Sequence, residues 1–87
     1  MGYDFELTDS AKKDLEGLSV VDLKRILIKI EWFSKQPQPL SFAVRLKNLS
    51  IGDFRFRVGD YRIIAFFDSK GKKIIIAAIG HRSEVYR

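Results

Sequence analysis

The chain has 87 residues, no cysteine, one histidine and a formal net charge of +5 at pH 7. This length fits one domain, residues 1–87, with a small core and marginal stability. The composition excludes disulfides, thiol catalysis, thiolate metal sites and a multi-histidine metal cluster, so we expect neither a metal nor a cofactor.

No stretch reaches the roughly 20 apolar residues of a membrane span, and the N-terminus has no basic-then-apolar export signal. We therefore expect a soluble, cytoplasmic protein with no membrane partner. The positive charge is uneven, because residues 1–43 carry six Lys/Arg against seven Asp/Glu and residues 44–87 carry ten against four. This asymmetry favours a second half that contacts a polyanion such as RNA. The alternative is a basic surface that only aids solubility.

The first half reads as a strand followed by two helices. Residues 3–7 alternate apolar and acidic side chains, as a half-buried strand does. Thr8 and Ser19 are good helix caps, Gly17 weakens the end of the first helix, and Pro37 stops the second near Lys35 or Gln36. The buried stripe of the second helix comprises Leu23, Ile26, Leu27, Ile30 and Phe33.

The second half reads as three strands, at residues 54–58, 61–68 and 73–80. Gly59-Asp60 makes the first turn and residues 69–71 the second. Residues 40–51 are predicted as an irregular connection with a short extended piece, and Ser83 as the start of a final helical turn. The predicted core aromatic residues are Trp32, Phe54, Phe56, Phe66 and Phe67.

These elements predict an α+β fold of order βααβββ. Short turns join the last three strands into an antiparallel meander, and the apolar last strand belongs in the sheet interior. The first strand returns through the helices and lies beside that last strand. The prediction is a helical hairpin packed on one face of a four-stranded, mainly antiparallel sheet of order 1-4-3-2, with the other face open.

Arginines are candidates for contacts to RNA phosphate on that open face. Arg55 and Arg57 alternate with apolar residues on one strand, and Arg62 lies on the next. Planar guanidinium groups suit phosphate because they stay charged and offer a fork of donors. Arg45 and Lys47, just before these strands, add positive charge. The alternatives are that Arg62 pairs with Asp60 or Asp68, and that Arg55 and Arg57 are solvated charges that protect a sheet edge.

Two motifs then suggest a family. The stretches Arg-Val-Gly-Asp-Tyr-Arg (57–62) and Gly-His-Arg-Ser-Glu-Val-Tyr (80–86) together resemble the RelE toxins of the RelE/ParE superfamily, and the resemblance spans nearly the whole chain. It implies the toxin of a type II toxin–antitoxin system, an mRNA interferase that cleaves A-site codons on the ribosome and inhibits translation. The implied partners are a RelB-like cognate antitoxin and the ribosome with its mRNA and rRNA.

The resemblance also implies site residues for metal-independent attack by the RNA 2′-hydroxyl. Arg55 and Arg57 stand where RelE has two lysines, and Arg62 matches the arginine of the family's turn. Arg82 or His81 matches a basic residue after the last strand, and Tyr86 matches a tail tyrosine. Arg62 is the predicted phosphate clamp, and His81 and Tyr86 are the candidates for proton transfer.

Other functions fit the same scaffold. A ParE-like toxin would bind DNA gyrase instead of RNA, and a non-catalytic member would bind only its antitoxin or RNA. His81 is alternatively a surface residue and Tyr86 a packing residue of the tail.

Overall fold

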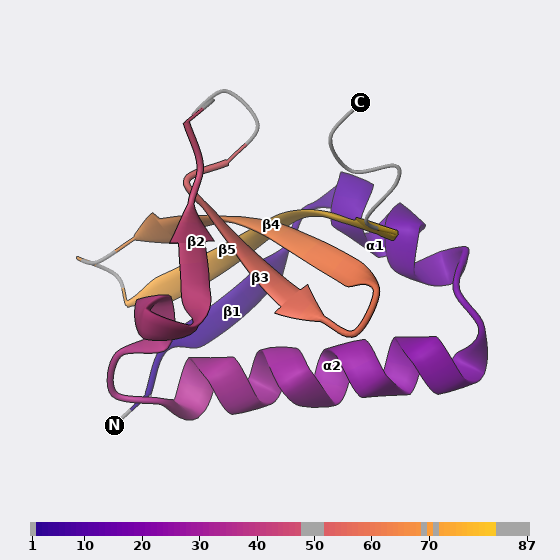
Figure 1. Ribbon diagram of the computed structural model, residues 1–87, viewed down its shortest axis with the longest axis horizontal. Coiled ribbons are helices and arrows are strands. Elements are labelled where there is room, and N and C mark those ends of the chain that lie inside the picture. The colour runs from indigo at the N-terminus through magenta and orange to yellow at the C-terminus, as the bar shows by residue number, and fades with distance from the viewer. Residues whose placement is uncertain (1, 48–51, 69, 71, 82–87) are drawn as a thin grey trace.

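The computed structural model describes residues 2–47, 52–68, 70 and 72–81, which form one mixed sheet with two α-helices (Figure 1). The elements in chain order are β1 (Asp4–Leu7), α1 (Asp9–Glu16), α2 (Val20–Lys35), the 3₁₀ helix η1 (Pro39–Phe42), β2 (Ala43–Arg45), β3 (Phe54–Val58), β4 (Tyr61–Asp68) and β5 (Lys73–His81). The strand order is β1-β5-β4-β3-β2. β1 runs parallel to β5, and the other neighbouring strands are antiparallel.

The predicted order of strands is confirmed, but the predicted number is one too low. The additional strand is β2, which lies in the stretch predicted as an irregular connection and pairs with the edge of β3. Alternation of Phe42, Val44 and Leu46 is the signal for it, and the strand is only three residues long. The proposed turn at residues 69–71 and helical turn at Ser83 lie wholly or partly outside the described residues.

Both helices begin at their predicted caps. The hydroxyl of Thr8 accepts a hydrogen bond from the Ala11 N–H at 3.1 Å, and that of Ser19 from the Asp22 N–H at 3.2 Å. These bonds satisfy N–H groups that have no partner within the helix. No helix in the described part of the chain is long and apolar enough to cross a membrane.

The core lies between the two helices and one face of the sheet. α1 packs mainly on β5, and α2 runs along β1 and β3, as the long magenta helix of Figure 1 shows. The α2 residues that enter the core are Ile26, Ile30 and Phe33, and the sheet contributes Phe56, Val58, Ile63, Ile74, Ile76 and Ile79. Phe33 and Phe56 hold this layer together with ring centroids 4.6 Å apart.

Trp32 is not a core residue, which corrects the prediction made from its sequence. Its side chain is 41% exposed, because helical rotation directs its neighbour Phe33 into the core instead. Of the four phenylalanines predicted with it, Phe56 is fully buried, and Phe54, Phe66 and Phe67 are half-buried.

An ion pair joins the parallel strands at the edge of the sheet. Lys73 Nζ lies 2.7 Å from Glu6 Oε1. This hydrogen bond, together with the attraction of the carboxylate, raises the pKa of Lys73 above its ordinary value. The pair is exposed, so it contributes little to stability.

The turn between β3 and β4 requires a left-handed residue, which gives a first prediction. Gly59 has φ +59°, so Gly59→Ala is expected to lower the free energy of unfolding by about 1 kcal/mol. Gly17→Ala is the matched control, since Gly17 has φ −81° and its added Cβ would lie 3.6 Å from the nearest atom. Urea denaturation followed by circular dichroism measures both. Equal stability of the two variants would show that the turn carries no strain.

Candidate nucleic-acid interface

Two arginines face each other across β3 and β4. The register pairs Arg57 with Arg62, and the adjacent pair is Phe56 with Ile63. Phe56 and Ile63 point into the core, so alternation puts Arg57 and Arg62 on the opposite face of the sheet. On the next strand Arg62 is paired with Gly80, which contributes no side chain.

Arg55 lies two residues before Arg57 and shares this face, and we call Arg55, Arg57 and Arg62 the arginine face. Arg57 is exposed, and its Nε donates a hydrogen bond to the Gly59 carbonyl at 3.2 Å. Arg55 and Arg62 are half-buried, and Nε of Arg62 is buried.

Helix α2 braces the turn that joins the two arginines. The Tyr61 hydroxyl donates a hydrogen bond to Asp22 Oδ2 at 3.0 Å, and Asp22 Oδ1 lies 3.8 Å from Arg25 Nη1. The guanidinium of Arg25 lies so close to Gly59 that an added Cβ would come within 2.7 Å of Nη2. The β4 side of the turn is therefore tied through Tyr61 to a helix on the other side of the sheet.

His81, a predicted candidate for proton transfer, does not join the arginine face. It is paired with Tyr61, and the two rings meet edge to face with centroids 5.9 Å apart. Both rings line a hollow of about 460 Å³ beside Lys13 and Asp14 of α1. The reason is the period of two in a strand: Gly80 shares the face of Arg62, so His81, one residue later, points to the helices.

Arg45, one of the two other basic candidates before β3, is also separate from the arginine face. The guanidinium of Arg45 lies 5.8 Å from the centre of the Phe54 ring, and Phe54 is its partner in the β2–β3 register. In that register Val44, not Arg45, is opposite Arg55. Lys47 is exposed beyond the end of β2. The remaining predicted site residues, Arg82 and Tyr86, lie outside the described residues.

Sequence reasoning missed the polar contacts that hold this part of the sheet. Asp14 of α1 accepts a hydrogen bond from the Ile79 N–H at 2.9 Å, next to Gly80. Thr8 donates one to the Ala77 carbonyl at 3.2 Å, so both ends of α1 are tied to β5. Such long-range pairs leave no periodic signal. Among the described residues no group of three or more His, Asp or Glu side chains is placed to hold a metal ion.

Comparisons with known proteins show the family and the fold of this chain. Residues 5–86 match the profile of the family described as ParE toxin of type II toxin-antitoxin system, parDE. The chain is 29% identical to the toxin RelG of Mycobacterium tuberculosis over 90 residues, which cover 100% of this chain and 99% of that protein.

Solved structures of RelE toxins share the fold. The archaeal RelE–RelB complex from Pyrococcus horikoshii matches with a TM-score of 0.75 at 27% identity, over 98% of this chain and 100% of that one. The RelBE2 toxin–antitoxin complex of M. tuberculosis matches with a TM-score of 0.71 at 27% identity, over 94% and 100%. The isolated E. coli RelE toxin, at 17% identity, matches in fold with a TM-score of 0.71 over 97% and 90%. The chain therefore belongs to the ParE toxin family of type II toxin–antitoxin systems and is a RelE-like toxin of the RelE/ParE superfamily.

Proposed function

We propose that this toxin is a ribosome-dependent endoribonuclease that cleaves mRNA in the A site and inhibits translation. The observation that carries the proposal is the directly opposed pair Arg57 and Arg62. Two guanidinium groups on adjacent strands can donate hydrogen bonds to the two non-bridging oxygens of one phosphate. Two cations on adjacent strands suit a site where negative charge develops during a reaction.

The chemistry needs three groups. A base removes the 2′-hydroxyl proton, the 2′-oxygen attacks the adjacent phosphorus, and an acid protonates the departing 5′-oxygen. The products are a 2′,3′-cyclic phosphate, which water can open to a 3′-phosphate, and a free 5′-hydroxyl. Arg57 and Arg62 would stabilise the phosphorane charge but cannot transfer the proton. For proton transfer we retain Tyr86, with Arg82 as a further cation, because His81 points to the other face.

The proposal includes a partner and a location. Solved relatives are complexes of RelE-like toxins with RelB-like antitoxins, and a RelB-like antitoxin is the partner we propose here. A toxin that cleaves mRNA on the ribosome acts in the cytoplasm, where its further partners are mRNA and rRNA.

Primer extension on translating ribosomes tests the proposed activity. Purified toxin is expected to produce stops within the A-site codon of ribosome-bound mRNA and none on the same mRNA without ribosomes. Antitoxin added in excess is expected to abolish the stops. Intact mRNA after incubation with toxin-loaded translating ribosomes would exclude this activity.

A second candidate is inhibition of DNA gyrase. It is favoured by the ParE description of the matching family. Gyrase supercoiling of relaxed plasmid, with and without toxin, separates the two functions. The proposed nuclease leaves supercoiling unchanged, whereas a ParE-like activity blocks it and needs no opposed arginines.

A further inference from the structure

A long-range hydrogen bond joins the first turn of α2 to the first residue of β4. The Tyr61 hydroxyl donates to Asp22 Oδ2 at 3.0 Å, across 39 positions of the sequence. The Tyr61 ring packs against the core and is paired with Val58 in the β3–β4 register. Arg62 follows Tyr61 directly and therefore points to the opposite face of the sheet. The bond thus lies behind Arg62, on the side of the sheet away from the arginine face.

Arg62 lies at a position in the sheet that is easily displaced. β3 ends at Val58 and β4 begins at Tyr61, so Arg57 and Arg62 are each one residue from the end of their strand. Strand ends and hairpin tips open more readily than the middle of a sheet, because fewer contacts hold them. A reaction whose cations must be placed to within about 0.5 Å therefore needs support at this end beyond the strand ladder.

β5, the strand beside β4, has a support of this kind. Asp14 of α1 accepts a hydrogen bond from the Ile79 N–H at 2.9 Å, one residue before the Gly80 that is paired with Arg62. The neighbouring strand is therefore held by a carboxylate of α1. The Tyr61 hydroxyl gives β4 itself the corresponding connection to a carboxylate of α2.

The Asp22 side chain is suited to hold its bond. It is 29% exposed, so water competes only in part for the carboxylate. Its Oδ1 lies 3.8 Å from Arg25 Nη1, and the Arg25 guanidinium lies close to Gly59 in the β3–β4 turn. The other oxygen, Oδ2, accepts the hydrogen bond from Tyr61. A charged acceptor makes a stronger hydrogen bond than a neutral one, which suits a connection that must hold a strand end in place.

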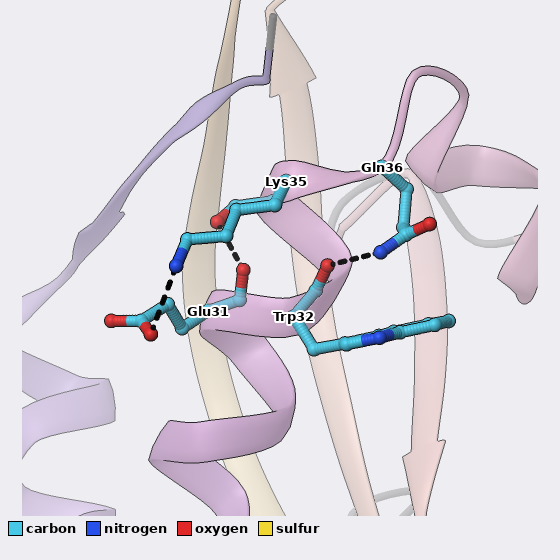
Figure 2. Close-up of polar contacts among 5 residues, drawn as sticks. Glu31, Trp32, Lys35 and Gln36 are labelled. Carbon is cyan, nitrogen blue, oxygen red and sulfur yellow. Dashed lines mark hydrogen bonds and ion pairs between the residues drawn. The ribbon is translucent and has the colours of Figure 1, made fainter.

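The polar contacts at the other end of α2 differ, because they stay within the helix and its cap. The Gln36 amide donates a hydrogen bond to the Trp32 carbonyl at 3.0 Å. Lys35 Nζ lies 3.4 Å from Glu31 Oε1, and Figure 2 shows both contacts. They stabilise the end of the helix, whereas the bond of Asp22 joins the helix to a strand.

We propose that Asp22 and Tyr61 are positioning residues of the nuclease, whose hydrogen bond fixes the start of β4 so that the Arg62 guanidinium is in place before RNA binds. The inference rests on the proposed endoribonuclease function and adds two residues that act through Arg62 without touching RNA. Their side chains meet on the helix side of the sheet. The effect on rate is large because a shift of about 1 Å in a reacting group can slow a reaction about 100-fold.

Tyr61→Phe tests the proposal, because it removes the hydroxyl and keeps the ring. In single-turnover cleavage on ribosomes loaded with mRNA, it is expected to lower the rate at saturating toxin about tenfold or more. The toxin concentration that gives half of this rate is expected to stay unchanged. A loss of stability alone would do the reverse. It would lower the native fraction and so raise the half-saturating concentration, but would leave the saturated rate as in the parent.

Asp22→Ala removes the same bond from the other side and is expected to lower the saturated rate to the same extent. The variant with both changes is expected to lose no more than either single variant, because one bond is lost in all three. Asp22→Asn keeps an acceptor oxygen on a side chain of the same length. It is expected to restore the saturated rate to within about threefold of the parent.

Two matched controls remove the same groups elsewhere. Tyr3→Phe deletes a hydroxyl from a ring that packs on Phe67 with centroids 5.2 Å apart. Glu31→Ala deletes a carboxylate of α2 whose ion pair is with Lys35 in the same helix. Both variants are expected to keep the saturated rate and the half-saturating concentration within about twofold of the parent, as surface changes usually do.

The position of Arg62 can also be followed without the reaction. Its Nε is buried, so in free toxin the Nε proton is expected to exchange slowly with water in nuclear magnetic resonance experiments. Tyr61→Phe is expected to speed this exchange about fivefold or more, because the strand end opens more often. Tyr3→Phe is expected to leave the exchange rate unchanged.

Several results would overturn the inference alone. They are a parent-like saturated rate in Tyr61→Phe, additive losses in the variant with both changes, and an unchanged exchange rate at Arg62. In each of these cases the parent toxin still cleaves mRNA, and the proposed function stands. A parent toxin that leaves ribosome-bound mRNA intact would overturn the proposed function, and the positioning role would be overturned with it.

Discussion

Arg62→Gln is expected to lower the rate of A-site mRNA cleavage by about 10²- to 10³-fold, the usual loss when one preorganised donor to a developing anion is removed. Arg62 lies opposite Arg57, and its Nε is buried. Partial burial strengthens its attraction to a phosphorane, and the sheet holds it in place before the reaction. Arg62→Lys is expected to recover only part of the rate, because an ammonium group keeps the charge but not the fork. Single-turnover cleavage on programmed ribosomes measures the rate.

The matched control is Arg45→Gln, because Arg45 is also a strand arginine but lies over Phe54, away from the arginine face. It is expected to cleave within about twofold of the parent, as surface changes usually do. A parent-like cleavage rate in Arg62→Gln would show that the arginine face does not act on the scissile phosphate.

Local patterns in the sequence are sufficient to predict most of the helices and strands of the fold. Thr8, Ser19 and Pro37 mark helix ends by their own hydrogen bonding and ring geometry, and the structure has those ends where the residues predict them. The apolar 73–80 stretch was correctly placed in the sheet interior, where β5 lies between β1 and β4. The short strand β2 was missed as a strand because three residues at an edge depend on pairing with β3 more than on propensity.

The sequence predicts only part of the candidate site, and this limit has a physical cause. Alternation along one strand fixes which side chains share a face, so Arg55 and Arg57 were correctly grouped. The pairing of Arg57 with Arg62 follows from the two-residue turn at Gly59-Asp60. His81 was misplaced because a sequence motif gives neighbours along the chain, whereas the face of a strand changes with every residue. The Asp22–Tyr61 bond spans 39 positions and has no local signal.

Trp32 shows a further limit of sequence reasoning. Large aromatic residues are usually predicted to lie in the core. The periodicity of α2, however, already gives a complete buried stripe that does not include Trp32. The spacing of Val21, Ile28 and Trp32 forms a second stripe in the same helix. That second stripe is visible in the sequence once the first is set aside, and it places Trp32 on the exposed side of α2 rather than in the core.

Phe56→Ala is expected to cost about 3–5 kcal/mol of folding free energy. Phe56 is 1% exposed, stacks on Phe33 of α2 and is paired in register with Ile63 and Ala43. A domain of this size has only about 4–13 kcal/mol in total, so the loss removes a large part of it. Urea denaturation followed by far-ultraviolet circular dichroism measures the change. The matched control is Phe42→Ala, the same truncation at a ring that is 47% exposed, which is expected to cost about 1 kcal/mol.

Phe56→Ala also tests whether core packing affects the arginine face, because Phe56 lies between Arg55 and Arg57 on β3. Loss of its ring is expected to lower cleavage only as far as the native fraction falls, since the arginines themselves are intact. Phe56→Leu refills most of the volume and is expected to restore both stability and cleavage to near the parent level. If Phe56→Leu folds like the parent and still fails to cleave, the packing under β3 sets the position of the arginines as well as the stability of the sheet. Equal costs for Phe56→Ala and Phe42→Ala would instead mean that the core does not depend on the contact between α2 and β3.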